Sequence, residues 1–158
     1  MTSDPITIVG ARPNLPKIAP LVRQMRGHPE IHPVLLHTGQ HYDDALSEIF
    51  FRQMGIRAPD VNLGVGSGSH AAQTAAILAR VEPVLLHHDP DLVLVVGDVN
   101  STIAVSLAAV KLGIPVAAAR DILAGKGKTG RLPALWDGRA AERIVDVLLQ
   151  IVPSGRGG

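Results

Sequence analysis

Short apolar runs alternate with longer segments of helical periodicity along most of this chain. Most of the runs are rich in Val, Ile and Leu, and the first, at residues 6–9, ends at Gly10, which is typical of a buried strand. The five predicted strands cover residues 6–9, 33–37, 61–63, 92–96 and 115–118. Every position of 92–96 is apolar, which indicates burial on both faces, as in a parallel sheet covered by helices.

The segments after the strands carry the start and stop signals of helices. Ser69 is suited to cap a long helix, and Asp137 a last one whose apolar positions form a continuous stripe. The predicted helices cover residues 15–26, 43 or 44 to 54, 69–88, 101–112 and 137–152. Strands that alternate with helices predict right-handed crossovers and a doubly wound α/β fold, a Rossmann-like parallel sheet of about five strands in the order 3-2-1-4-5.

In such a sheet, ligands bind outside the carboxyl ends of the strands, where the strand order reverses. Two loops meet there, at residues 10–14 and 97–102. Arg12 and Lys17 could hold a phosphate at a helix N-terminus, with a solvated surface pair as the alternative. Asp98 comes directly after the central strand, where a carboxylate is costly to bury without a partner, so it is a candidate acid or base. Capping the next helix is the alternative, and one residue can do both.

Composition narrows the classes of function. The 158 residues are 46% hydrophobic and 18% charged, which suits one buried core and excludes a disordered chain. A net charge of +1 gives no bulk attraction to nucleic acid or to an anionic membrane. No apolar run approaches the ~20 residues of a membrane span, the start does not resemble a signal peptide, and there are no cysteines. We therefore expect a soluble cytoplasmic protein that binds neither nucleic acid nor membrane.

Four motifs resemble those of the non-hydrolysing UDP-N-acetylglucosamine 2-epimerases. Residues 10–20 resemble the family's opening Gly-Thr-Arg-Pro-Glu-x-x-Lys-x-x-Pro, with Ala11 and Asn14 as departures. The stretches Thr-Gly-Gln-His, Gly-Ser-Gly-Ser-His and Gly-Asp-Val-Asn-Ser-Thr then occur in the family's order, at residues 38–41, 66–70 and 97–102. The resemblance implies half of a two-domain, glycosyltransferase-B-type fold and a UDP-sugar as ligand.

The resemblance also implies roles for particular residues. These are a residual catalytic role for Asp98 and substrate binding by Arg12, Lys17, Gln40 and His41. For His41, a surface position is the alternative. We expect no metal site, because His37 and His41 lie on a strand end and a loop instead of one helix face. We also expect no nicotinamide or other cofactor, because the glycine-rich residues 64–69 lack the full dinucleotide-binding spacing.

After its fifth strand the chain departs from the family pattern. The family continues with a His-x-Glu-Ala-Gly-x-Arg stretch and then a Pro-Glu-Glu stretch, whereas residues 117–121 read Ala-Ala-Ala-Arg-Asp. Residues 132–138 and 140–144 resemble the family's C-terminal end, whose last helix crosses back to the first domain. We therefore expect a Rossmann-like first domain over 1–120, a linker over 121–136, and a C-terminal helix over 137–152 that packs on the same domain.

Two functions remain open. The family reaction eliminates UDP across C1 and C2 of the sugar and adds it back with inversion, which needs a base, groups for the diphosphate and a closed cleft. Asp98 alone cannot supply these, so we expect a truncated or engineered domain, catalytically inactive, that binds a UDP-sugar weakly if at all. The alternative is a functional epimerase, converting UDP-GlcNAc to UDP-ManNAc, assembled from more than one chain. Surplus apolar positions in the 69–88 helix predict a homodimer through helices of this domain.

Overall fold

The computed structural model describes residues 5–9, 15–39, 49, 51–97, 99–118 and 139–151. Its strands form one sheet in the order β3-β2-β1-β4-β5. Their bounds are β1 (Pro5–Val9), β2 (Val34–His37), β3 (Val61–Asn62), β4 (Leu92–Val95) and β5 (Val116–Ala118). Every described strand pair is parallel, and β1 lies between β2 and β4, so the strand order reverses there. The predicted parallel α/β architecture is confirmed.

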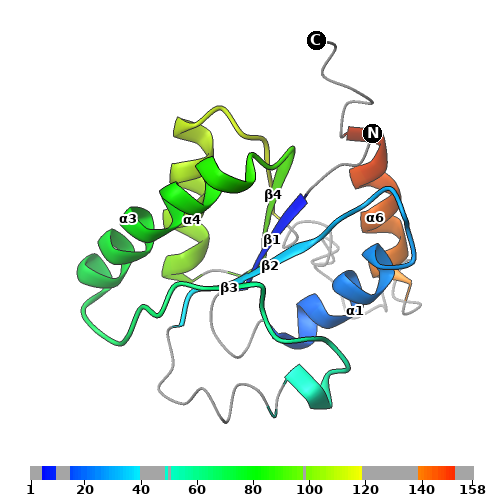
Figure 1. The fold of residues 1–158 in the computed structure, drawn as a ribbon, viewed down its shortest axis with the longest axis horizontal. Helices are drawn as coiled ribbons and strands as arrows, with labels where there is room; N and C mark the ends of the chain where they lie inside the picture. The colour runs from blue at the N-terminus through cyan, green and yellow to red at the C-terminus, as the bar shows by residue number, and fades with distance from the viewer. Residues whose placement is uncertain are drawn as a thin grey trace, which may run out of the picture.

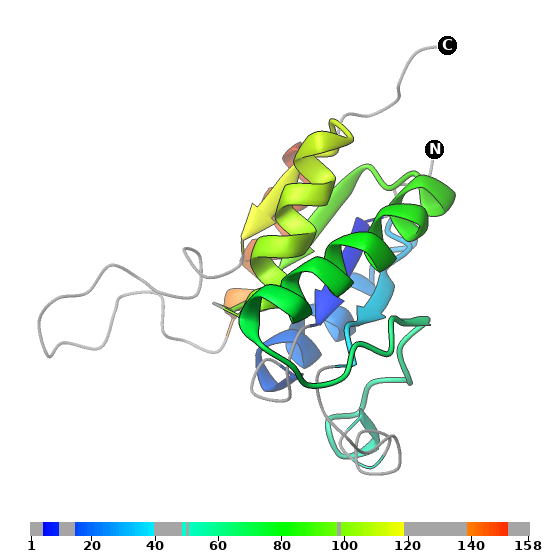
Figure 2. The same cartoon turned by 90° about the vertical axis from the view of Figure 1, so that its left-hand side faces the viewer.

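Helices cover both faces of this sheet. They are α1 (Leu15–Met25), α3 (His70–His88), α4 (Asn100–Lys111) and α6 (Ala140–Ile151), and residues 51–53 are helical as well. Figure 1 shows α1 and α6 on one side of the sheet and α3 and α4 on the other. Figure 2, turned by 90°, shows α3 and α4 lying side by side over their face. None of the helices in the described ranges is long and apolar enough to cross a membrane.

The strand β4 divides its side chains between two hydrophobic cores. Leu92 and Leu94 belong to the core beneath α1 and α6, whereas Val93 and Val95 belong to the core beneath α3 and α4. All four are buried, because successive side chains of a strand point to opposite faces and both faces are covered. The apolar run that the sequence shows at this position therefore reflects a strand in the middle of a three-layer structure.

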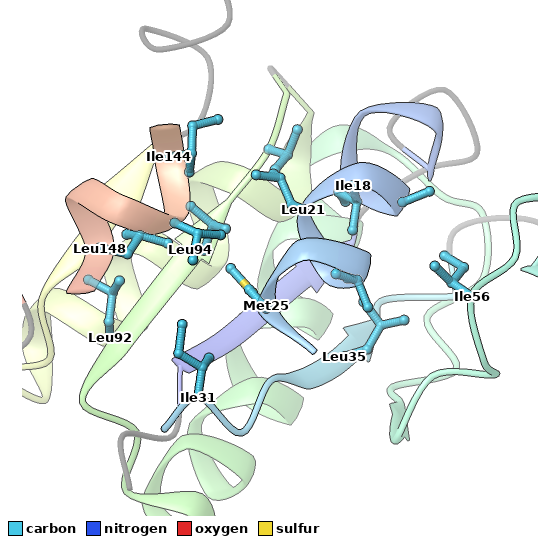
Figure 3. Close-up of a cluster of buried hydrophobic side chains, with 14 of the residues drawn as sticks. Ile18, Leu21, Met25, Ile31, Leu35, Ile56, Leu92, Leu94, Ile144 and Leu148 are labelled. Atoms are coloured by element: carbon cyan, nitrogen blue, oxygen red, sulfur yellow. The ribbon is translucent and has the colours of Figure 1, made fainter. Parts of the chain in front are cut away.

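The helix α6 completes the first of these cores. It packs against α1, and its buried side chains Ile144 and Leu148 lie in the same cluster as Ile18 of α1 and Leu92 and Leu94 of β4. Figure 3 shows them meeting between the two helices and the sheet. A segment from the end of the chain thus shares one core with the first helix.

Most of the large exposed apolar side chains on the α3 and α4 layer lie on α4, whereas the sequence analysis expected them on the 69–88 helix. Ile77 and Leu85 of α3, counted as surplus in the sequence, are fully buried in the second core. These side chains are not surplus, because α3 packs against the sheet and against α4 at the same time. More of the helix surface is therefore buried than one sheet face alone would cover. The large exposed apolar side chains on this layer are Leu86 of α3 (63% exposed) and Ile103, Leu107 and Val110 of α4 (64%, 46% and 64%).

Replacing Ile144 by alanine should destabilise the protein markedly. Ile144 is fully buried, and removing a buried aliphatic side chain leaves a cavity, so we expect a loss of about 2–5 kcal/mol in the free energy of unfolding. Val147, on the same helix but 41% exposed, is the matched control, and Val147→Ala should change this free energy by no more than about 0.5 kcal/mol. Urea unfolding of both variants tests this, and equal effects would show that α6 is not docked through this face.

Candidate functional site

The candidate site lies where the carboxyl ends of β1, β2 and β4 meet at one edge of the sheet. Lys17, the predicted substrate-binding residue on α1, has an exposed side chain. The other predicted site residues, namely Arg12, Gln40, His41 and Asp98, lie outside the described residues. What the structure does describe is the strands and helices on either side of these residues and the contacts that hold the neighbouring loop segments.

A buried pair of hydroxyl groups joins two of these loops. Thr38 comes directly after β2, Ser101 lies in the first turn of α4, and their Oγ atoms are 3.1 Å apart. Both side chains are buried, where a hydroxyl group without a partner is costly, so this hydrogen bond specifies how the two segments approach each other. Because β2 and β4 are the two neighbours of β1, the pair ties together the segments after the strands on either side of β1.

The loops after β2 and β3 are held together through their backbones. The N–H of Leu63 donates to the His37 carbonyl at 2.8 Å, and the N–H of Val65 donates to the Thr38 carbonyl at 2.9 Å. Gly39 and Gly64 both have positive φ, at +74° and +60°. A Cβ on Gly39 would lie 2.9 Å from the Gly64 Cα, so only glycine fits this contact. The Thr-Gly-Gln-His motif therefore begins in a loop whose backbone is closely packed.

His37 supports the same loop from the end of β2. Its Nδ1 accepts a hydrogen bond from the Gly39 N–H at 3.1 Å, so in this arrangement Nδ1 carries no proton. Its ring is edge-on to Phe51, with the ring centroids 6.0 Å apart. Among the described residues, no three histidine, aspartate or glutamate side chains gather closely enough to hold a metal ion. His37 is thus engaged with the loop and with Phe51.

The loop that carries Asp98 is fixed on both of its sides. The Thr102 hydroxyl donates to the Gly97 carbonyl, and the Thr102 N–H donates to the Val99 carbonyl, both at 2.9 Å. The N-cap position of α4 is Val99, which makes no side-chain capping bond. The backbone on either side of Asp98 is therefore tied to the first turn of α4.

A polar face on α3 contacts two of these loops, and the sequence analysis did not identify it. Arg80 Nη1 donates to the carbonyls of Leu63 and Gly64, at 2.8 and 2.7 Å. Gln73 donates to the Gly66 carbonyl and accepts from Asn100. The remaining member, His70, also lies beside Asn100. Their spacing, three and then seven residues apart, places His70, Gln73 and Arg80 on one helix face, and this was the signal available in the sequence.

Comparison with known proteins adds an independent line of evidence. A family model described as UDP-N-acetylglucosamine 2-epimerase matches residues 23–125. A UDP-N-acetylglucosamine 2-epimerase homolog of Methanococcus maripaludis is 51% identical over 112 residues, which are 71% of this chain and 31% of the relative. The chain thus spans about a third of the length of that curated relative.

Solved structures agree with this comparison. The crystal structure of Methanocaldococcus jannaschii UDP-GlcNAc 2-epimerase in complex with UDP-GlcNAc and UDP superposes with a TM-score of 0.69 at 39% identity, and covers 73% of this chain and 32% of that one. The Neisseria meningitidis UDP-GlcNAc 2-epimerase bound to UDP-GlcNAc superposes with a TM-score of 0.69 at 31% identity, and covers 92% of this chain and 38% of that one. Because the match to the N. meningitidis enzyme covers 92% of this chain, it includes part of the sequence that follows β5.

Replacing Gly39 by alanine should disrupt the contact between the β2 and β3 loops. An L-residue is strained at this φ, and the new methyl group meets the Gly64 backbone, so we expect a loss of at least about 2 kcal/mol in the free energy of unfolding. Gly66→Ala is the control, because a Cβ on Gly66 meets nothing within 4 Å. Chemical denaturation measures both variants, and a Gly39→Ala protein as stable as Gly66→Ala would contradict this close packing of the two loops.

Proposed function

This chain belongs to the UDP-N-acetylglucosamine 2-epimerase family, and we propose that it is the first, Rossmann-like half of a glycosyltransferase-B-type epimerase. As a single chain, it binds UDP-GlcNAc weakly and does not convert it. Two lines of evidence support the ligand class: the M. jannaschii and N. meningitidis relatives are solved with UDP-GlcNAc, and the loops of this chain converge at the switch point of its sheet.

The proposal of inactivity rests on the sequence after β5. The family's two glutamate-bearing stretches are not found after Ala118, and the sequence holds a single glutamate beyond it, Glu142. Glu142 lies on α6, where its carboxylate accepts a hydrogen bond from Arg139 Nε at 2.7 Å. A 2-epimerase must remove the C2 proton and handle a leaving diphosphate, and Asp98 is the one remaining candidate for this chemistry.

The proposed domain organisation rests on the docking of α6. We assign residues 1–120 to the Rossmann-like domain, 121–136 to a linker and 137–152 to a helix equivalent to the family's last one. The packing of α6 on α1 and the 92% coverage in the match to the N. meningitidis enzyme support this assignment. The chain then represents a truncated or engineered single-domain form of the family.

Within the site, each proposed role corresponds to one loop. Arg12 and the N-terminus of α1 receive the diphosphate, because a guanidinium and free backbone N–H groups both favour phosphate. Lys17, exposed on α1, adds positive charge nearby. Gln40 and His41 contact the sugar nucleotide from the β2 loop, and Asp98 faces the ligand from the β4 loop. The proposed binding involves no cofactor.

Titration with UDP-GlcNAc tests the proposed binding. We expect a Kd of roughly 1 mM, or about −4 kcal/mol, because the proposed half of a two-domain fold offers only one side of the ligand cleft. Arg12→Ala should abolish the NMR shifts caused by the ligand, because a guanidinium paired with phosphate is hard to replace. Arg26→Ala, which removes the same charge from the exposed position just beyond α1, should leave them unchanged.

The same samples test turnover. A coupled assay for UDP-ManNAc and deuterium exchange at C2 in heavy water should both give no signal. Micromolar affinity, or any exchange at C2, would support the alternative, a functional epimerase assembled from more than one chain. Equal loss of binding in Arg12→Ala and Arg26→Ala would instead indicate non-specific attraction of the anion.

We further propose that the chain forms a homodimer through α4. Ile103, Leu107 and Val110 are spaced four and three residues apart, so they form one exposed apolar stripe along the helix, and Leu86 of the adjacent α3 is exposed as well. The helix carries no charged side chain before Lys111. A second copy is a fitting partner, because two such stripes related by a two-fold axis each cover the other's apolar surface.

Leu107→Lys should convert this dimer to a monomer. Placing a charge at the centre of the stripe forces a buried ammonium into the interface, whereas Val147→Lys, on the exposed face of α6, leaves α4 unchanged. Light scattering at about 100 µM should show a dimer for the parent and for Val147→Lys, since association at that concentration requires only ~5–6 kcal/mol. A monomeric parent under these conditions excludes the proposed dimer.

A further inference from the structure

We infer that Gln73 is a positioning residue that couples the glycine-rich loop after β3 to the loop that carries Asp98. The inference deepens the proposed function and rests on it, because it concerns how two loops of that site are held relative to each other. Gln73 lies in the first turn of α3 and its side chain is half-buried. It matches none of the motifs through which the sequence resembled the family.

Both the nitrogen and the oxygen of the Gln73 carboxamide form hydrogen bonds. Its Nε2 donates to the Gly66 carbonyl at 3.1 Å, and its Oε1 accepts from Asn100 Nδ2 at 2.9 Å. A backbone carbonyl can only accept, so the Gly66 contact determines which end of the Gln73 amide faces the β3 loop. The oxygen must then face Asn100, and this in turn directs the Asn100 nitrogen towards α3. The orientation of the Asn100 amide therefore depends on the position of Gly66.

His70 completes the chain of hydrogen bonds on the α4 side. Its Nδ1 lies 3.1 Å from Asn100 Nδ2 and 3.2 Å from Asn100 Oδ1, so it can pair with the amide in either tautomer. Asn100 is the first residue of α4 and stands two positions after Asp98. Two side chains of α3 thus hold the residue at which the Asp98 loop enters its helix.

The β3 loop is itself held by other described contacts. Arg80, seven residues further along the same face of α3, donates to the carbonyls of Leu63 and Gly64. Val65 donates to the Thr38 carbonyl, which connects this loop to the β2 loop. If ligand binding shifted the glycine-rich loop, the Gly66 carbonyl would move and the Gln73 amide would move with it. The hydrogen bond from Gln73 to Asn100 would then shift the Asn100 side chain. Side chains that hold a site within a few tenths of an ångström contribute to its preorganisation.

Two substitutions at Gln73 separate the two hydrogen bonds. Gln73→Met keeps the length of the side chain and removes both bonds, whereas Gln73→Glu keeps an acceptor for Asn100 and sets a carboxylate against the Gly66 carbonyl. Thr74→Ala is the control at the next position, because the Thr74 hydroxyl donates to the His70 carbonyl within α3 and makes no described contact with either loop. The reporters are two backbone N–H groups: that of Val65, which bonds to Thr38 from the β3 loop, and that of Thr102 in the first turn of α4, which bonds back to Val99.

Amide hydrogen exchange on the full chain without ligand is the first readout. In Gln73→Met we expect the exchange of both reporters to accelerate about tenfold, because each loop loses a tie to α3. In Gln73→Glu only Val65 should accelerate, and in Thr74→Ala neither should. Acceleration of all core amides together with a lower Tm would overturn the inference, since that result describes a purely structural role. So would acceleration of only one reporter in Gln73→Met.

Ligand titration is the second readout and separates the two proposals. If the parent chain binds UDP-GlcNAc, Gln73→Met should raise the Kd several-fold at unchanged Tm, and an unchanged Kd would overturn the positioning role. If the parent chain does not bind UDP-GlcNAc at all, the proposed function fails. The exchange data then still decide whether Gln73 couples the two loops.

Discussion

Every layer of this molecule depends on the burial of β4 on both of its faces. Leu92 and Leu94 face one core, and Val93 and Val95 face the other, so the strand requires a helical layer on each side. A strand with two apolar faces cannot lie at an exposed surface without a large hydrophobic penalty. In the structure β4 lies inside the sheet, between β1 and β5, and parallel strands of this kind are joined by crossover connections, which here supply covering helices.

Because β1, β2 and β4 are parallel, the loops that follow them all lie at the same edge of the sheet. The candidate site is located at this edge for that reason. A small number of polar contacts between segments far apart in the chain hold these loops in place. The Thr38 and Ser101 hydroxyl groups join the segments on either side of β1, and the α3 side chains Gln73 and Arg80 hold the loop after β3. The site framework therefore depends on helix packing at least as much as on the loops themselves.

The role of α6 shows how the fold completes its first layer. Leu92 and Leu94 of β4 share a cluster with Ile144 and Leu148, so part of the sheet on the α1 side is covered by a helix from the other end of the sequence. Without that helix, apolar side chains of β4 would face solvent. In the proposed organisation, a helix that crosses between two domains in complete epimerases serves here to cover the core of one.

The order and type of the elements could be predicted from the sequence, because these depend on local signals. Apolar runs, terminal glycines and the Ser69 cap, whose Oγ accepts from the Ala72 N–H as predicted, each act within a few residues. The folded structure was needed to show which side of α4 is exposed, that Gly39 must pack against Gly64, and that Gln73 joins two loops. These features depend on contacts between residues that are distant in the chain, and no periodicity in the sequence records which distant surface a side chain will meet.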